Sequence, residues 1–236
     1  MKHGITTFGL VLLLLPAGAV AQGTTRGTEP LGGAPARQFD ELTRLASERL
    51  HRALLIDVEQ QAPRVALVVE AERYARGATE LEPGSAEGWF LIAAAMGLRA
   101  HYEPTREKIR MAGEMWSHAS TALERDPDHA GAHHVLGRLN LEAMTLSGMA
   151  RMIATHFYGS TLLRRASWQQ AELHLRRAVA LEPDALYHRL WLARLYLERD
   201  EEDEAEALLR AIVASPADSP LDRLWKKEAA EDLRRL

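Results

Sequence analysis

A spacing of small residues and prolines constrains the fold of this chain more than any other feature. Residues 171–183 read AELHLRRAVALEP, in which Ala171, Ala178 and Pro183 are separated by seven and then five positions. Two small residues seven apart lie on the same face of a helix, where a neighbouring helix can approach closely. The proline stands where the helix must end and the chain must turn.

This spacing recurs along the chain. It is found at Ala71, Ala78 and Pro83, at Met115, Ala122 and Pro127, and, with the proline one residue early, at Ala205, Ile212 and Pro216. LGRLNLE at residues 136–142 and LARLYLE at residues 192–198 are also 56 positions apart, as are Pro127 and Pro183. Repeated helix pairs of this kind are typical of tetratricopeptide repeats. We therefore predict an all-α, tetratricopeptide-like right-handed helical repeat solenoid of about four helix pairs plus a C-terminal capping helix.

The intervals between the prolines predict two insertions. A plain tetratricopeptide unit has about 34 residues. Pro83 and Pro127 are 44 residues apart, and Pro127 and Pro183 are 56 apart. We expect both additional segments, of about 10 and about 22 residues relative to that period, between the two helices of a pair. The longer insertion is placed at about residues 143–166.

Apolar periodicity and capping residues give the expected helices within one repeat domain, residues 38–236. The expected ranges are 38–62, 64–81, 86–100, 106–126, 129–142, 168–182, 185–199, 203–213 and 220–236. Ser85, Asp128 and Ser167 are the expected N-caps, and Pro63 is expected to end the first helix and to open the next one at its first turn.

Residues 1–21 have the features of a secretory signal peptide. Lys2 provides a positive start, residues 8–15 are apolar, and Ala19 and Ala21 form a small-x-small cleavage site. A membrane anchor is the alternative, but the apolar run is shorter than the roughly 20 residues that a spanning helix needs. Residues 22–37 are rich in Gly, Pro and Thr, and we expect them to form a disordered linker. The mature protein is then periplasmic or secreted, with no transmembrane segment after cleavage.

The composition excludes several classes of protein. The chain contains no cysteine, so disulfides, thiolate chemistry and lipidation of a cysteine are excluded. It is 47% hydrophobic but only 6% aromatic, which suits closely packed helices better than sheets. A net charge of −4 gives no reason to expect nucleic acid or an anionic membrane as partner.

A histidine-rich segment is the strongest candidate for a metal site. His129 and His133 lie at i and i+4 and could share an ion, with Asp128, His134 and His118 nearby. The sequence has no HExxH motif, however, so packing or surface roles are favoured over zinc. It also contains no GxSxG elbow and no glycine-rich phosphate loop. We therefore predict a protein that is not an enzyme and that has no metal, no cofactor and no catalytic residues.

The concave groove of the solenoid is the expected ligand site. The first helix of each pair lines this surface, and its small packing positions are Ala93, Gly137 and Ala193. Their neighbours form the predicted ligand-binding set: Phe90, His134, Arg138, Tyr187, Leu190 and Arg194.

Arg138 and Arg194 occupy equivalent positions in consecutive pairs. Two guanidinium groups facing one groove suit a carboxylate or a phosphate. The alternative is that each arginine pairs with a glutamate at i+4, Glu142 or Glu198.

Residues 144–163 contain three methionines and two aromatic residues but few charges. Long loops commonly pack by their own side chains, which predicts a plug on the solenoid. An adaptable apolar lid over a peptide or an acyl chain is the alternative, because methionine side chains reshape easily.

A further set of positions matches a known pattern: Lys108, Ile109, residues 134–138, Arg151, Ala154 and Phe157. Through them, residues 87–236 resemble the repeat domain of the regulator of microtubule dynamics family. At the start of the insertion, Ser147 and Gly148 stand where the family has a tryptophan. The resemblance implies a helical repeat fold and a binding role. The export signal argues against a microtubule role and indicates an exported bacterial member.

These observations predict a non-catalytic adaptor or scaffold of the bacterial cell envelope, which holds an unidentified protein or peptide in its groove. The alternative function is a carrier of a lipid or another apolar ligand beneath the methionine-rich insertion.

Overall fold

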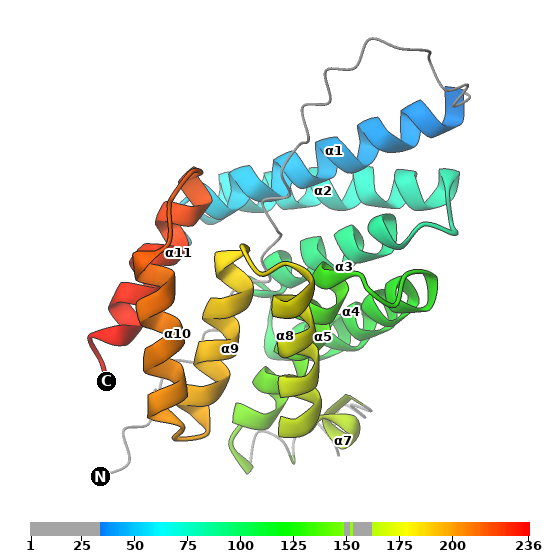
Figure 1. Ribbon diagram of the computed structural model, residues 1–236. Helices are drawn as coiled ribbons and strands as arrows, with labels where there is room; N and C mark the ends of the chain where they lie inside the picture. The colour runs from blue at the N-terminus through cyan, green and yellow to red at the C-terminus, as the bar shows by residue number, and fades with distance from the viewer. Residues whose placement is uncertain (1–33, 149–151, 153–161) are drawn as a thin grey trace.

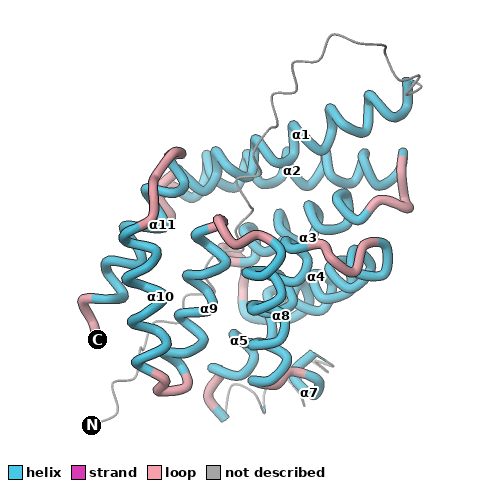
Figure 2. Tube along the Cα trace, in the orientation of Figure 1, coloured by secondary structure: helices cyan, strands magenta, loops and turns pink. Residues whose placement is uncertain are grey.

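The computed structural model describes residues 34–148, 152 and 162–236, and every regular element in these ranges is a helix (Figures 1 and 2). The expected signal peptide, most of the expected linker and most of the methionine-rich insertion lie outside the described residues. The helices are α1 (Ala34–Leu55), α2 (Gln61–Leu81), α3 (Ala86–Ala100), α4 (Thr105–Arg125), α5 (Ala130–Thr145), α7 (Leu162–Arg165), α8 (Trp168–Leu181), α9 (Leu186–Glu198), α10 (Glu202–Ala214) and α11 (Pro220–Leu233).

The helices pack as consecutive antiparallel pairs, which confirms the predicted repeat fold. Helix α1 packs on α2, α3 on α4, α5 on α8 and α9 on α10, and α11 packs on α10 at the end of the stack. Each pair also contacts the next, through α2 and α3, α4 and α5, and α8 and α9. Figure 1 shows this succession of pairs from blue to red.

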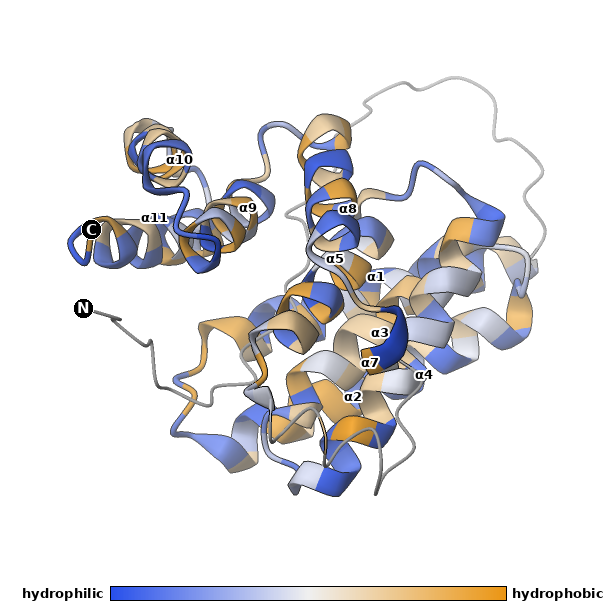
Figure 3. Ribbon diagram, turned by 90° about the horizontal axis from the view of Figure 1, so that it is seen from below, coloured by the Kyte–Doolittle hydropathy of each residue, from blue (hydrophilic) through white to orange (hydrophobic). Residues whose placement is uncertain are grey.

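The small residues of the sequence repeat lie at the crossings between helices. Ala71, Ala78, Ala122, Ala171, Ala178, Ala205 and Ile212 are completely buried, and Met115 is nearly so. Each therefore faces a neighbouring helix, as the seven-residue spacing requires. The remaining faces carry polar residues, so most helices are amphipathic (Figure 3).

Gly137 permits a close approach between the two helices of a pair, α5 and α8. A Cβ atom at this position would lie 2.7 Å from Cγ of Leu175 on α8 and 3.0 Å from its backbone nitrogen. Because backbone cannot move aside as a side chain can, no larger residue fits without separating α5 from α8.

The structure distributes the additional residues differently from the prediction. Between α3 and α4 only residues 101–104 are non-helical, and α4 is 21 residues long where α8 has 14. The first addition therefore lengthens a helix instead of forming an insertion between helices. The second does lie between the helices of a pair, since α5 and α8 are separated by residues 146–167, which include α7.

Local structure differs from the prediction at both ends of α1 and at the N-cap of α5. Helix α1 begins at Ala34 and ends at Leu55, well before Pro63, which lies in the first turn of α2 as predicted. The N-cap of α5 is His129, whose Nδ1 accepts from the Ala132 amide at 3.1 Å, and not Asp128. Ser167 does cap α8, as predicted, by accepting from the Gln170 amide.

One arrangement of ion pairs occurs twice, at positions 100 residues apart. Glu72 on α2 binds Arg76 one turn later and Arg99 on α3, each at 2.7 Å. Glu172 on α8 binds Arg176 at 3.1 Å and Arg199, next to α9, at 2.6 Å. In both cases a glutamate of one pair joins the next pair, so the repeat extends to polar contacts between repeats.

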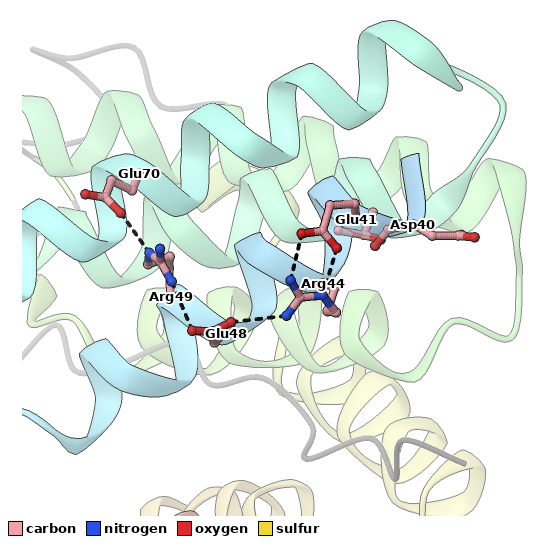
Figure 4. Close-up of polar contacts among 7 residues, drawn as sticks. Asp40, Glu41, Arg44, Glu48, Arg49 and Glu70 are labelled. Atoms are coloured by element: carbon pink, nitrogen blue, oxygen red, sulfur yellow. Dashed lines mark hydrogen bonds and ion pairs between the residues drawn. The ribbon is translucent and has the colours of Figure 1, made fainter. Parts of the chain in front are cut away.

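A chain of ion pairs also follows α1 and crosses to α2 (Figure 4). Arg44 binds Glu41 and Glu48, and Arg49 binds Glu48 and, at 2.7 Å, Glu70 on α2. Surface pairs of this kind contribute about 0–1 kcal/mol each, so they add little to the stability of the first pair.

Helix α11 brings the two ends of the stack together. It contacts α9 and α10 and also α1, so the first and last described helices touch, as Figure 1 shows. A capping box starts this helix: the Asp222 amide donates to Ser219 Oγ, and the Ser219 amide donates to Asp222 Oδ2. Within the described ranges, no helix is both long and apolar enough to cross a bilayer.

Ala178→Glu tests the repeat frame. It places a carboxylate at a completely buried crossing of α8, so we expect the free energy of unfolding to fall by about 3 kcal/mol or more. The matched control is Ala180→Glu, because Ala180 lies on the exposed side of the same helix. Urea denaturation measures both. Equal stabilities would show that the frame is displaced.

Candidate functional site

Five of the six predicted ligand-binding residues are buried. Phe90, His134, Arg138, Tyr187 and Leu190 have exposed fractions of 2% or less, and only the Arg194 side chain, at 21%, reaches the surface. They lie on α3, α5 and α9, the first helices of consecutive pairs, as predicted.

These five residues are buried because of contacts between helices that the repeat pattern does not predict. The inner helices α3, α5 and α9 contact one another in sequence, and α11 packs on α9 from the other side. Positions next to the small residues therefore meet neighbouring inner helices. The role of the six residues in ligand binding stays a prediction.

Arg138 and Arg194 converge on one aromatic ring. The guanidinium carbon of Arg138 lies 3.6 Å from the centroid of the Trp191 ring, and that of Arg194 lies 4.9 Å from it. A tryptophan ring attracts cations through its negative face. Attraction to the Trp191 ring thus offsets part of the repulsion between the Arg138 and Arg194 guanidinium groups.

The two arginines have different acidic partners. Arg138 pairs with Glu142 one turn later, which is the alternative that the sequence offered. Arg194 pairs outside its own helix. It binds Glu228 at 2.9 Å and Asp232 at 2.8 Å, both on α11.

Several buried nitrogens of this cluster have no hydrogen-bond partner among the described residues. They are Nε and Nη1 of Arg138, Nε2 of His134 and Nε1 of Trp191. Leaving a buried donor unsatisfied costs about 1–3 kcal/mol. Burial accordingly lowers the pKa of Arg138, against the raising effect of Glu142. The cluster is therefore suited to an acceptor or an anion.

A second polar cluster joins α5 to α9. His134 Nδ1 lies 2.9 Å from His188 Nδ1, and Nε2 of His188 lies 2.6 Å from the Tyr187 hydroxyl and 3.3 Å from Glu182. Burial lowers the pKa of His134, and the neighbouring His188 adds to this effect. Burial also lowers the pKa of His188, while Glu182 opposes the change.

A similar histidine pair joins α5 to α8. His133 Nε2 donates to the Pro127 carbonyl at 2.9 Å, so its Nδ1 is the acceptor for Nδ1–H of His174, also at 2.9 Å. At the equivalent place in the preceding pair, Trp89 donates to the Pro83 carbonyl at 3.0 Å and stacks on His118. His133 thus occupies a packing position of the repeat.

The histidines predicted as the alternative metal ligands are engaged by protein groups. His129 caps α5 and lies 3.1 Å from Glu87 through its Nε2, and His133 holds His174. Among the described residues, no group of three or more His, Asp or Glu side chains is arranged to hold a metal ion.

Sequence reasoning missed four residues that organise these clusters: Trp191, His188, Glu228 and Asp232. Trp191 and His188 lie next to the predicted residues Leu190 and Tyr187 on α9. Sequence spacing alone does not show which of these neighbours faces the clusters. The two acids lie on α11, and only the three-dimensional structure brings that helix onto α9.

Comparisons with known proteins identify a family whose profile matches most of this chain. The profile of a family described as "Regulator of microtubule dynamics protein 1-3" matches residues 36–236. Regulator of microtubule dynamics protein 1 of Caenorhabditis elegans is 26% identical over 169 residues, which cover 72% of this chain and 74% of that protein.

Two further proteins are similar. Regulator of microtubule dynamics protein 3 of Rattus norvegicus is 24% identical over 197 residues, or 83% of this chain, but the match spans only 39% of the rat protein. The crystal structure of a thermophilic TPR protein of Thermus thermophilus is 20% identical with a TM-score of 0.48, covering 84% of this chain and 97% of that one.

Acid is expected to weaken the fold through the histidine pairs. Burial lowers the pKa of His174 to about 4, whereas an unfolded histidine titrates near about 6.5. Between these values the unfolded chain binds a proton that the folded chain does not. The contribution of His174 to the free energy of unfolding is therefore constant above about pH 6.5. Below that pH this contribution falls towards about pH 4, by at most about 1.4 kcal/mol per pH unit.

His174→Asn keeps an amide donor in place of Nδ1 but cannot be protonated, so the melting temperature of this variant should fall less between about pH 7 and about pH 5. Leu173→Asn is the control, since Leu173 is exposed on the same helix. Calorimetry at several pH values measures this, and identical profiles for wild type and His174→Asn would exclude His174 as a source of the acid sensitivity.

Proposed function

Since the chain belongs to the regulator of microtubule dynamics family, we propose that it is a non-catalytic scaffold of the bacterial cell envelope, which binds a protein or peptide on its concave side. Stacked helix pairs form extended surfaces that bind protein partners. A role as a protein-interaction scaffold follows from the repeat fold and the family.

The convergence of Arg138 and Arg194 on Trp191 carries the proposal for the concave side. An arginine recognises a carboxylate with two parallel hydrogen bonds, and a nearby aromatic ring keeps the cation in place. Arg194 already binds carboxylates here, from Glu228 and Asp232. A partner with acidic side chains fits this surface better than one with a basic or apolar surface.

The cell envelope is proposed from residues 1–21 and their features of a cleaved signal peptide. The printed names of the relatives concern microtubule dynamics. An exported chain would not meet microtubules, so a different partner is proposed for this member of the family.

The alternative, a carrier of a lipid or another apolar ligand, depends on residues 144–163. Most of this insertion lies outside the described residues. Since no described contact favours an apolar ligand there, the carrier enters only as an outcome of the test below.

Native mass spectrometry of the protein purified from its own cells tests the scaffold role. We expect a polypeptide bound in stoichiometric amount and released as the salt concentration rises, because screening weakens contacts between charges. A co-purifying lipid mass would instead favour the carrier. The absence of any bound polypeptide would contradict the scaffold.

Arginine labelling with a dicarbonyl reagent then tests the location of the site. The partner should reduce the modification of Arg194 at least about tenfold and leave Arg210 unchanged, since Arg210 lies on the outer face of α10 with its side chain 68% exposed. Peptide mapping measures both sites. Equal protection of the two arginines, or none, would place the partner elsewhere.

The mature N-terminus tests the location in the cell. Mass spectrometry of the exported protein should give a first residue of Gln22, because cleavage is expected after Ala21. Recovery of intact Met1 in the membrane fraction would contradict export with cleavage and identify the segment as an anchor.

A further inference from the structure

Helix α11 supplies most of the acidic groups that face the arginines of the inner surface. Glu228 and Asp232 lie one turn apart on this helix and together bind Arg194 of α9. Nη2 of Arg194 donates to Glu228 at 2.9 Å, and Nε donates to Asp232 at 2.8 Å. These contacts join residues that are 34 and 38 positions apart, so they depend on how α11 docks and not on local structure.

The charge of Glu228 also acts on two other arginines. Arg64, near the start of α2, is only 2% exposed, and its guanidinium donates to the Ile56 carbonyl while Nε and Nη2 have no partner among the described residues. Burial lowers the pKa of Arg64, where Tyr102, Asp57 and then Glu228 oppose the change. Burial also lowers the pKa of Arg138, which Glu142 opposes most and Glu228 least. Glu228 thus binds Arg194 directly and adds a smaller favourable charge at Arg64 and Arg138.

Without α11, Arg194 would lose both of its acidic partners, whereas Arg138 would keep Glu142. Several guanidinium nitrogens of Arg138 and Arg64 have no partner among the described residues even with α11 in place. Buried cations are costly unless they are paired. Arg194 therefore needs an occupant that supplies two carboxylates in the places of Glu228 and Asp232.

The face that α11 presents has a definite pattern. Leu221 and Trp225 are buried at 4% and 2% exposure, and they are followed by Glu228 and Asp232. Steps of four, three and four residues place all four side chains on one face of a helix. This face therefore combines an apolar half that packs with an acidic half that binds arginine.

From these contacts we infer that the inner surface recognises an acidic amphipathic helix of a partner protein, and that α11 is a built-in occupant of the same site. The partner helix carries two apolar residues followed by two carboxylates in the spacing of Leu221, Trp225, Glu228 and Asp232. The inference rests on the proposed scaffold function and names its class of partner.

Helix α11 does not need α9 in order to start. Its capping box of Ser219 and Asp222 is local, and the preceding residues 215–219 are non-helical. The capping box continues to favour a helical first turn when a competitor occupies the surface on which α11 docks. To exchange α11 for a partner helix, only α11 has to move, and residues 215–219 connect it to α10.

A synthetic peptide with residues 218–236 and a fluorescent label is the probe. Full-length protein carrying Glu228→Gln and Asp232→Asn should bind it at least about tenfold more tightly than wild type, because the weakened α11 competes less well. The control is Glu231→Gln, since Glu231 pairs with Lys227 on the outer side of α11. Fluorescence anisotropy measures the dissociation constants.

A peptide with Gln and Asn at positions 228 and 232 should bind at least about tenfold more weakly than the unchanged peptide. The inference is overturned if the double variant binds the peptide no better than wild type, or if the substituted peptide binds equally well.

Hydrogen exchange of the wild-type protein provides a measurement that does not depend on a variant folding. Saturating peptide should accelerate amide exchange in residues 220–233 by displacing α11, and unchanged exchange would reject the inference. If the natural partner protects Arg194 but the peptide fails to bind, the scaffold function stands and this inference fails. If the peptide exchanges but no polypeptide co-purifies, the acidic-helix surface stands and the scaffold function fails.

Discussion

The close crossing of helices over small side chains is the contact on which the rest of this structure depends. Ala71, Ala171 and Ala205 are completely buried at equivalent places in three pairs, and Gly137 brings α5 against the backbone of α8. Side chains of this size allow two helix axes to approach and pack with few voids. Each pair then presents its first helix to the inside of the stack, which is how α3, α5 and α9 become neighbours.

Polar contacts recur at equivalent positions of the repeat. Glu72 with Arg99, and Glu172 with Arg199, join successive pairs in the same way. At the ends of the second helices, Trp89 and His133 reach equivalent proline carbonyls. A histidine in this place keeps the hydrogen bond of the tryptophan and adds a group that titrates. Equivalent positions of the repeat thus share the same backbone geometry, while the side chain at one position can differ in its chemistry.

The sequence was sufficient to predict the pairs, because their spacing is local. Seven residues between Ala171 and Ala178 fix a helix face, and Pro183 fixes where the helix ends. The surroundings of the site were not predictable in this way. Arg194 finds its acids on α11, 34 and 38 positions later, and no periodicity within α9 contains that information.

Local capping was equally hard to assign. Asp128 and His129 are adjacent, both can accept a hydrogen bond from a helix amide, and the structure uses His129. The prediction for Arg138 retained the correct alternative, its pair with Glu142, because an i to i+4 contact can be read from spacing.

The contact between α1 and α11 changes how this stack holds together as a whole. In an open solenoid each repeat depends only on its neighbours, and the terminal repeats fray first. Here neither end can loosen without breaking a contact with the other, so the arrangement is thermodynamically closer to a ring than to a row. Closure couples the first and last pairs across nearly the whole described chain. Greater cooperativity comes with slower folding, since contacts so distant in sequence form late.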